Sequence, residues 1–134
     1  MRNNHNPEGV AGPFASYSHG VELDGSYRFL FGAGQAGVSA DGSIGEGIAE
    51  QAAHVWSNIR QVLASADMAI SDIVQLNMLL IDRGDYPEAA AIRESNLDGH
   101  RPASTLMYVS GLANPDWRIE IDFIAACPDV EDAG

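Results

Sequence analysis

Residues 48–81 have the sequence IAEQAAHVWSNIRQVLASADMAISDIVQLNMLLI, and this stretch decides the fold class. In its first part, residues 48–66, apolar side chains recur at intervals of three and four, which is the spacing of one face of an amphipathic helix. In its last part, residues 72–81, nearly every side chain is apolar, as in a central strand packed on at least one face. A long helix followed by such a strand predicts a domain in which helices cover a sheet.

Weaker patterns on either side complete the order of elements. Residues 21–31 predict a β-hairpin, because two apolar stretches flank an Asp-Gly turn. Residues 86–97 predict a second helix, and residues 103–109 and 117–125 predict two more strands, the last with alternating apolar and polar side chains. The order β-β-α-β-α-β-β predicts an α+β fold in two layers, with one mixed sheet and both helices on one face.

The 134 residues predict a single domain with less regular ends. Residues 1–15 are rich in Asn, Gly and Pro and predict a loosely held arm, residues 16–128 hold the predicted elements, and residues 129–134 form an acidic tail. Apolar positions on both faces of the sheet predict self-association, because the face without helices would otherwise be exposed to solvent. We therefore expect a homo-oligomer with ligand clefts where subunits meet.

Charge and composition argue against several classes of function. The formal net charge is −12, with seven arginines and no lysine, so neither nucleic acid nor an anionic membrane is an expected partner. The chain has no stretch apolar enough to span a membrane, and its first residues lack the apolar segment of a secretory signal, so we expect a cytoplasmic protein. The lone Cys127 and the scattered histidines predict no metal site and no cofactor, although a ligand role stays open for His19 and His100.

Two features stand out as candidates for chemistry. Residues 32–37 spell GxGxxG after a strand, but the next helix begins about ten residues later, which favours a ligand-facing or interface loop over a dinucleotide site. Glu120 lies in the last strand, on the same face as Arg118 and Asp122 and opposite its apolar neighbours. A solvated strand face has the same pattern, so a catalytic and a purely structural interpretation of Glu120 both stay open.

These residues also occur in short motifs by which the chain resembles the RidA/YjgF family of reactive-intermediate (enamine/imine) deaminases, also called endoribonuclease L-PSP-like. The resemblance covers residues 12–127. It rests on GP at 12–13, YSHG at 17–20, AGQ at 33–35, DIV at 72–74, RPAST at 101–105 and RIEIDFIAA at 118–126. The resemblance implies a chorismate-mutase-like fold and a homotrimer with three clefts between subunits.

The resemblance also implies an activity and a set of cleft residues. The family hydrolyses short-lived enamines and imines, such as 2-aminoacrylate, to 2-oxo acids and ammonia. A carboxylate in the family's last strand helps to place the attacking water, and Glu120 is the matching residue. Tyr17 matches a tyrosine that lines the cleft, and Ala33, Gly34 and Gln35 match a stretch that shapes the pocket.

The chain departs from the family at the arginine that pairs with the substrate carboxylate, since Ser104 is the matching residue. A serine does not reproduce a bidentate ion pair, and losing such a pair corresponds to about 2–4 kcal/mol. Arg101 and Arg93 are the two candidates to replace this arginine. Ala33 and Ala90 also stand where the family often has a serine and an asparagine.

Two hypotheses of different classes follow. The first is an enzyme that hydrolyses an enamine or imine other than 2-aminoacrylate, for example an amino-dienoate, and releases ammonia. The second is a non-catalytic trimer that uses the same clefts to bind a small metabolite or to regulate a partner. A ribonuclease, which the family's second name suggests, conflicts with the net charge of −12.

Overall fold

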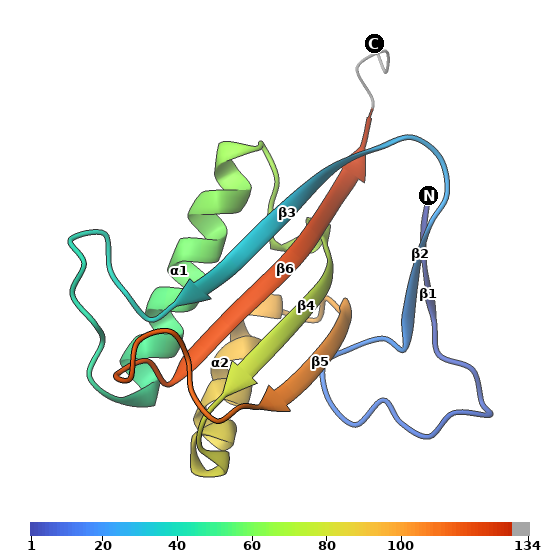
Figure 1. Ribbon diagram of the computed structural model, residues 1–134. Coiled ribbons are helices and arrows are strands. Elements are labelled where there is room, and N and C mark those ends of the chain that lie inside the picture. Colours follow the sequence, from blue (N-terminus) through green and yellow to red (C-terminus); the bar gives the residue numbers. More distant parts are fainter. Residues whose placement is uncertain (130–134) are drawn as a thin grey trace.

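The computed structural model describes residues 1–129, which form a four-stranded sheet, two helices and a separate two-stranded ribbon (Figure 1). The helices are α1 (Gly47–Ser65) and α2 (Tyr86–Leu97). The strands are β1 (Arg2–His5), β2 (Gly20–Leu23), β3 (Tyr27–Ala36), β4 (Ile73–Leu80), β5 (Ala103–Tyr108) and β6 (Ile119–Pro128). Short 3-10 turns, η1 (Ile70–Asp72) and η2 (Arg83–Asp85), precede β4 and α2. Residues 130–134 of the expected acidic tail lie outside the described part of the chain.

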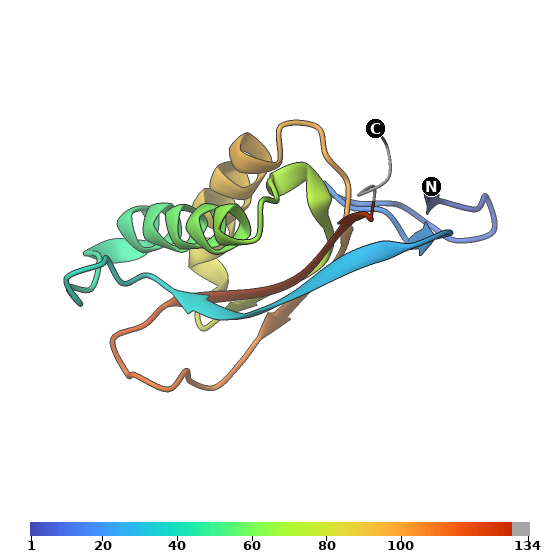
Figure 2. The same cartoon turned by 90° about the horizontal axis from the view of Figure 1, so that it is seen from above.

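The strands of the main sheet lie in the order β3-β6-β4-β5. Strand β6 runs antiparallel to both of its neighbours, whereas β4 and β5 are parallel. A parallel pair needs a crossover connection, and α2 provides it. Both helices cover the same face of the sheet (Figure 2), which confirms the predicted two-layer α+β fold.

The core lies between α1 and the sheet. Most of the apolar stripe predicted for the helix is buried in the structure, and its other two members, Val62 and Ala66, are partly buried. The buried residues are Ile48, Ala52, Val55, Trp56, Ile59 and Leu63. Alternate residues of the two central strands face it: Leu76, Met78 and Leu80 of β4, and Ile119, Ile121, Phe123 and Ala125 of β6. The spacing of apolar residues in each element thus matches the face that the element buries.

The predicted hairpin of residues 21–31 is wrong. Strand β2 pairs instead with β1, with Arg2 opposite Leu23, so a segment expected to be a loosely held arm is a strand. After Gly25, which has a φ of +112°, the chain turns away and β3 pairs with β6 from Tyr27 to Ala36. Strand β6 is ten residues long and pairs with eight residues of β3, whereas β2 is only four residues long, and this difference favours the non-local pairing.

The face of the sheet away from the helices, which we call the open face, is not covered by any element of residues 1–129. Phe29 and Phe31 of β3 stack there with ring centroids 6.4 Å apart, and they are 54% and 74% exposed. Met107 of β5 is 44% exposed. Polar residues share this face, since Asn77 Nδ2 donates a hydrogen bond to Asp122 Oδ1 at 2.9 Å. An exposed face of this composition is typical of a surface that contacts another molecule.

Candidate active site

The residues singled out in the sequence form two groups in different parts of the chain. Glu120 and Gly34 lie on β6 and β3 and meet at the open face. Tyr17, Ser104 and Arg93 line a cavity beside β5, at the other edge of the sheet. Because β4 lies between β6 and β5, a single chain does not bring the two groups together.

Glu120 is half-buried on β6, opposite Leu79 of β4 and Ala36 of β3. Its carboxylate lies close to the backbone of β3, because a Cβ built on Gly34 would be 2.2 Å from Glu120 Oε2. Only glycine fits beside the carboxylate in this arrangement. Within residues 1–129 the carboxylate accepts no hydrogen bond and forms no ion pair, so its oxygens remain available to a water or a ligand.

The GxGxxG stretch is the bulged end of β3, not the loop that the sequence predicts. The register against β6 shifts between Gly32 and Gln35. A Cβ on Gly32 would lie 2.2 Å from the ring of Phe123, so this glycine allows close packing of β3 on β6. Gln35 Nε2 donates to the carbonyl oxygen of Ala33 at 3.2 Å. Gly32 therefore allows β3 to pack closely on β6, and Gly34 leaves room for the Glu120 carboxylate.

The start of β6 is held in place by contacts with two other elements. Arg118 forms a bidentate pair with the buried Asp85, with Nη2 to Oδ1 at 2.7 Å and Nε to Oδ2 at 3.0 Å. Its backbone N–H donates to Oε1 of Gln51, a buried residue of α1, at 2.8 Å. Gln51 Nε2 in turn donates to the carbonyl oxygen of Asp116 at 3.0 Å. These bonds fix the backbone two residues before Glu120.

The second group of residues lines a cavity of about 360 Å³, which we call the edge cavity. Its walls are Phe14, Ala15, Tyr17, Tyr86, Arg93, Ser104, Thr105 and Leu106. The segment that carries Tyr17 is fastened to the start of β5, because Ser18 Oγ donates to the carbonyl oxygen of Arg101 at 2.6 Å and Ser18 N–H donates to that of Pro102 at 3.0 Å. The cavity thus joins the N-terminal segment, α2 and β5.

The two arginines proposed as replacements at Ser104 differ in their surroundings. Arg93 is 5% exposed and lines the edge cavity. Its Cζ lies 5.9 Å from the ring centroid of Tyr86, in the range of a cation-π contact. Arg101 lies outside the cavity lining and pairs with Glu94 at 3.2 Å, where both side chains are half-exposed. The structure therefore brings Arg93, and not Arg101, together with Ser104.

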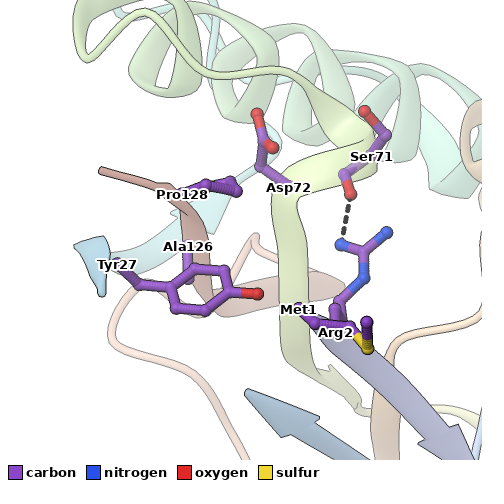
Figure 3. A pocket seen from close by; sticks show the side chains of 7 residues that line it. All are labelled: Met1, Arg2, Tyr27, Ser71, Asp72, Ala126 and Pro128. Atoms are coloured by element: carbon purple, nitrogen blue, oxygen red, sulfur yellow. Dashed lines mark hydrogen bonds between the residues drawn. The ribbon is translucent and has the colours of Figure 1, made fainter. Parts of the chain in front are cut away.

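Three further cavities contain arginines that already have partners. One of about 350 Å³ is lined by His100 and by Arg60, whose Nη2 donates to Asn96 Oδ1 at 3.1 Å. Another, of about 320 Å³, lies near the N-terminus, where Arg2 Nη1 donates to the carbonyl oxygen of Ser71 at 2.6 Å (Figure 3). A third, of about 440 Å³, contains the Arg118–Asp85 pair. None of the three is lined by Tyr17, Ser104 or Arg93, which the edge cavity brings together. The edge cavity is therefore the stronger candidate for a binding site.

The two histidines with an open ligand role lie outside the lining of the edge cavity. His100 Nε2 lies 2.6 Å from the carbonyl oxygen of Ile73, and burial of the ring lowers the pKa of His100. His19 stands edge-on to Tyr17, with centroids 5.6 Å apart, and its backbone N–H donates to Asn6 Oδ1 at 2.8 Å. Residues 1–129 contain no cluster of three or more His, Cys, Asp or Glu that could hold a metal ion. The helices of this part of the chain are too short or too polar to cross a bilayer.

Comparison with known proteins identifies the family. The family model described as Endoribonuclease L-PSP matches residues 9–127. Protein HMF1 of Saccharomyces cerevisiae is 30% identical over 99 residues, which cover 73% of this chain and 74% of HMF1. The 2-iminobutanoate/2-iminopropanoate deaminase of Rattus norvegicus is 31% identical over 114 residues, which cover 82% of this chain and 79% of the deaminase. The structure of YyfB, a Rid family protein of Yersinia pestis, matches with a TM-score of 0.80 at 30% sequence identity. The match covers 94% of this chain and 98% of the YyfB chain. The chain therefore belongs to the endoribonuclease L-PSP family, which is the RidA/YjgF family.

Proposed function

We propose that the protein hydrolyses imines of 2-oxo acids to the 2-oxo acid and ammonia, at sites shared between the subunits of a homotrimer. The observation that carries the proposal is the Glu120 carboxylate, which is half-buried, lies against Gly34 and has no partner within residues 1–129. The rat relative, named for deamination of two small imino acids, supports the same reaction. The cytoplasm, expected from the sequence, is the proposed location.

The proposed reaction consumes one water and needs only proton transfers. The water oxygen adds to the carbon of the C=N bond, while Glu120 accepts a proton from that water and passes it to the imine nitrogen. The resulting carbinolamine then returns its hydroxyl proton through Glu120 to the nitrogen, the C–N bond breaks, and ammonia leaves as the C=O bond forms. A carboxylate held at a fixed backbone position suits this role, because it orients both the water and the proton.

The separation of the two groups supports a shared site. Glu120 lies on the open face, whereas Tyr17 and Ser104 line the edge cavity, and β4 lies between them. If the edge cavity of one subunit packs against the open face of the next, the two groups meet and the exposed apolar side chains of that face are covered. In a closed ring of three subunits this contact would occur three times. Ala33 and Gln35, which flank Gly34, would then line the same cleft.

The activity is tested by producing imines in solution with an amino acid oxidase and following their capture by semicarbazide together with ammonia release. The protein should accelerate imine loss, and Glu120→Gln should reduce that acceleration about 100-fold or more. The matched control is Asp122→Asn on the same strand and face, whose side chain already bonds Asn77. It should keep the activity. An amino-dienoate is included in the panel, and no acceleration of any substrate would refute the proposal.

The shared site is tested separately by sedimentation velocity. We expect a species with three times the 14.2 kDa mass of one chain. A monomer that still hydrolyses imines would show that one chain completes the site, and would contradict the arrangement between subunits.

A second candidate function is a non-catalytic trimer that binds a small metabolite. The observation that favours it is Ser104, which stands where the resemblance implies a substrate-binding arginine. This alternative predicts saturable binding of a 2-oxo acid with no turnover of its imine. We do not propose a ribonuclease, because a net charge of −12 repels a polyanion.

A further inference from the structure

One buried charge among residues 1–129 has no ionic or hydrogen-bonding partner. Among residues 1–129, the buried charged side chains are Asp85 and Arg93. Asp85 is neutralised by Arg118. Arg93, at 5% exposure, forms no ion pair and no hydrogen bond within this part of the chain, and its Nε is completely buried without an acceptor. Burial of an unpaired cation is strongly unfavourable, so we expect the guanidinium to bind an anion that does not come from residues 1–129.

The surroundings of Arg93 indicate which anion fits. The side chain lines the edge cavity together with Tyr17, Ser104 and Thr105, each of which carries a hydroxyl group. Tyr17 Oη accepts a hydrogen bond from the backbone N–H of Phe14 at 3.2 Å, so the phenolic proton is free to be donated. A guanidinium in a cavity lined by hydroxyl-bearing residues matches a carboxylate, which offers two acceptor oxygens in one plane.

Apart from Thr105, the remaining walls of the edge cavity are apolar or aromatic. Phe14, Ala15, Tyr86 and Leu106 contribute them. The volume of about 360 Å³ lies within the range of small-molecule sites and exceeds what a carboxylate alone fills. The small side chain of Ser104 leaves part of the cavity volume empty, whereas an arginine at the same position would fill much of it. The cavity therefore has room for a carboxylate and an apolar substituent attached to it.

Resting on the proposed function, we propose that Arg93 binds the substrate carboxylate in this chain, and that the preferred substrates are 2-imino acids with a large apolar or aromatic side chain. The anchoring cation is supplied by helix α2 in place of strand β5. Moving the cation from the strand to the helix leaves the cavity beside Ser104 open to the substrate side chain. Small imino acids bind less well, because they leave the apolar wall unfilled.

The first test compares imines made from alanine, leucine and phenylalanine in the semicarbazide assay. Wild type should show a kcat/KM for the leucine and phenylalanine imines at least about tenfold above that for the alanine imine. Arg93→Met should lower kcat/KM for the larger imines about 10- to 100-fold. Arg60→Met, on an exposed face of α1, is the control and should stay within about twofold. A preference for the alanine imine, or full activity of Arg93→Met, would overturn the proposal.

The second test measures binding without turnover. Phenylpyruvate, a stable 2-oxo acid, is titrated calorimetrically into wild type, Arg93→Met and Arg93→Lys. Binding should be lost in the methionine variant and partly retained in the lysine variant, which keeps the charge but not the fork of donors. Methionine removes the buried charge with little loss of volume, so thermal unfolding should show a folded protein. If phenylpyruvate binding depends on Arg93 but no imine is hydrolysed, the proposed function is refuted and the role of Arg93 as carboxylate anchor is supported. If imines are hydrolysed but Arg93→Met binds phenylpyruvate as well as wild type does, only the role of Arg93 is refuted.

Discussion

The two faces of the main sheet differ in what they bury, although they share the same strands. Along β6, Ile119 and Ile121 are fully buried beneath α1, whereas Glu120, between them, faces away and is only half-buried. The covered face is continuous and apolar, as the core of a domain requires. The open face combines exposed aromatic side chains with a carboxylate that has no partner within residues 1–129. The covered face therefore provides the stability of the domain, whereas the exposed aromatic pair and the Glu120 carboxylate lie on the open face.

The largest expected effect concerns Ile121 and Ile124, which lie three residues apart on β6 and face opposite sides. Ile121→Ala should lower the free energy of unfolding by about 3 kcal/mol, because Ile121 is 0% exposed and its loss leaves a cavity in the core. Ile124→Ala on the open face should lower it by less than about 1.5 kcal/mol. Urea denaturation of both variants at low protein concentration makes the comparison. Equal effects would mean that the open face is as well packed as the covered one.

The second prediction concerns the close approach between β3 and Glu120. Gly34→Ala places a methyl group 2.2 Å from the present position of Glu120 Oε2, so the carboxylate must move and imine hydrolysis should fall about 100-fold. Stability should change less, because the displaced atoms are the end of a flexible side chain. Gly9→Ala is the matched control, since nothing lies within 4 Å of a Cβ at that position. If Gly34→Ala retained full activity, Glu120 would not need its present position for catalysis.

A smaller effect is expected on assembly. Phe31→Asp places a charge in the exposed aromatic pair of the open face, and Phe31 is already 74% exposed within one chain. The isolated chain should therefore remain folded, while self-association weakens about tenfold or more. Sedimentation velocity over a dilution series gives the association constant, and circular dichroism checks the fold. An unchanged association constant would show that subunits do not meet at this aromatic pair.

Local patterns were sufficient for most of the fold. The helix predicted at residues 48–66 is α1 at Gly47–Ser65, and the predicted strand at residues 72–81 is β4 at Ile73–Leu80. Periodicity fixes such elements because each apolar side chain must face the same side. The predicted hairpin failed for a different reason, since the partner of β3 is a strand about 90 residues further along the chain. A turn signal shows where the chain bends, but it does not show which strand the next segment will pair with.

The candidate site shows the same limit. Alternation in the last strand was sufficient to place Glu120 opposite the core. It could not show that Arg93 lines a cavity with Ser104, because that contact joins a helix to a strand through tertiary packing. Phe14 was missed as well, although an aromatic residue directly after Gly12-Pro13 was a usable signal. Arg101 is closer to Ser104 in sequence, yet it points to Glu94.

The smallest predicted effect concerns the free-energy cost of protonating a partly buried histidine, His100, in the folded chain. His100, whose Nε2 lies 2.6 Å from the carbonyl oxygen of Ile73, has a pKa below its ordinary value of 6.5, because burial disfavours the cation; nearby Arg2 acts in the same direction. Below about pH 6.5 the unfolded chain therefore binds a proton that the folded chain does not, and the free energy of unfolding falls as pH decreases towards the lowered pKa. Above this window His100 is neutral in both states and makes no pH-dependent contribution.

His100→Gln should flatten this slope, since an amide can donate to the same carbonyl and does not titrate. Thermal unfolding of both proteins between pH 8 and pH 5 provides the measurement. As pH falls from 8 to 5, the unfolding temperature of the wild type should decrease more than that of the variant. Parallel curves would show that His100 is solvated as well in the folded chain as in the unfolded one, and that this part of the covered side accommodates a charge as readily as the open face accommodates Glu120.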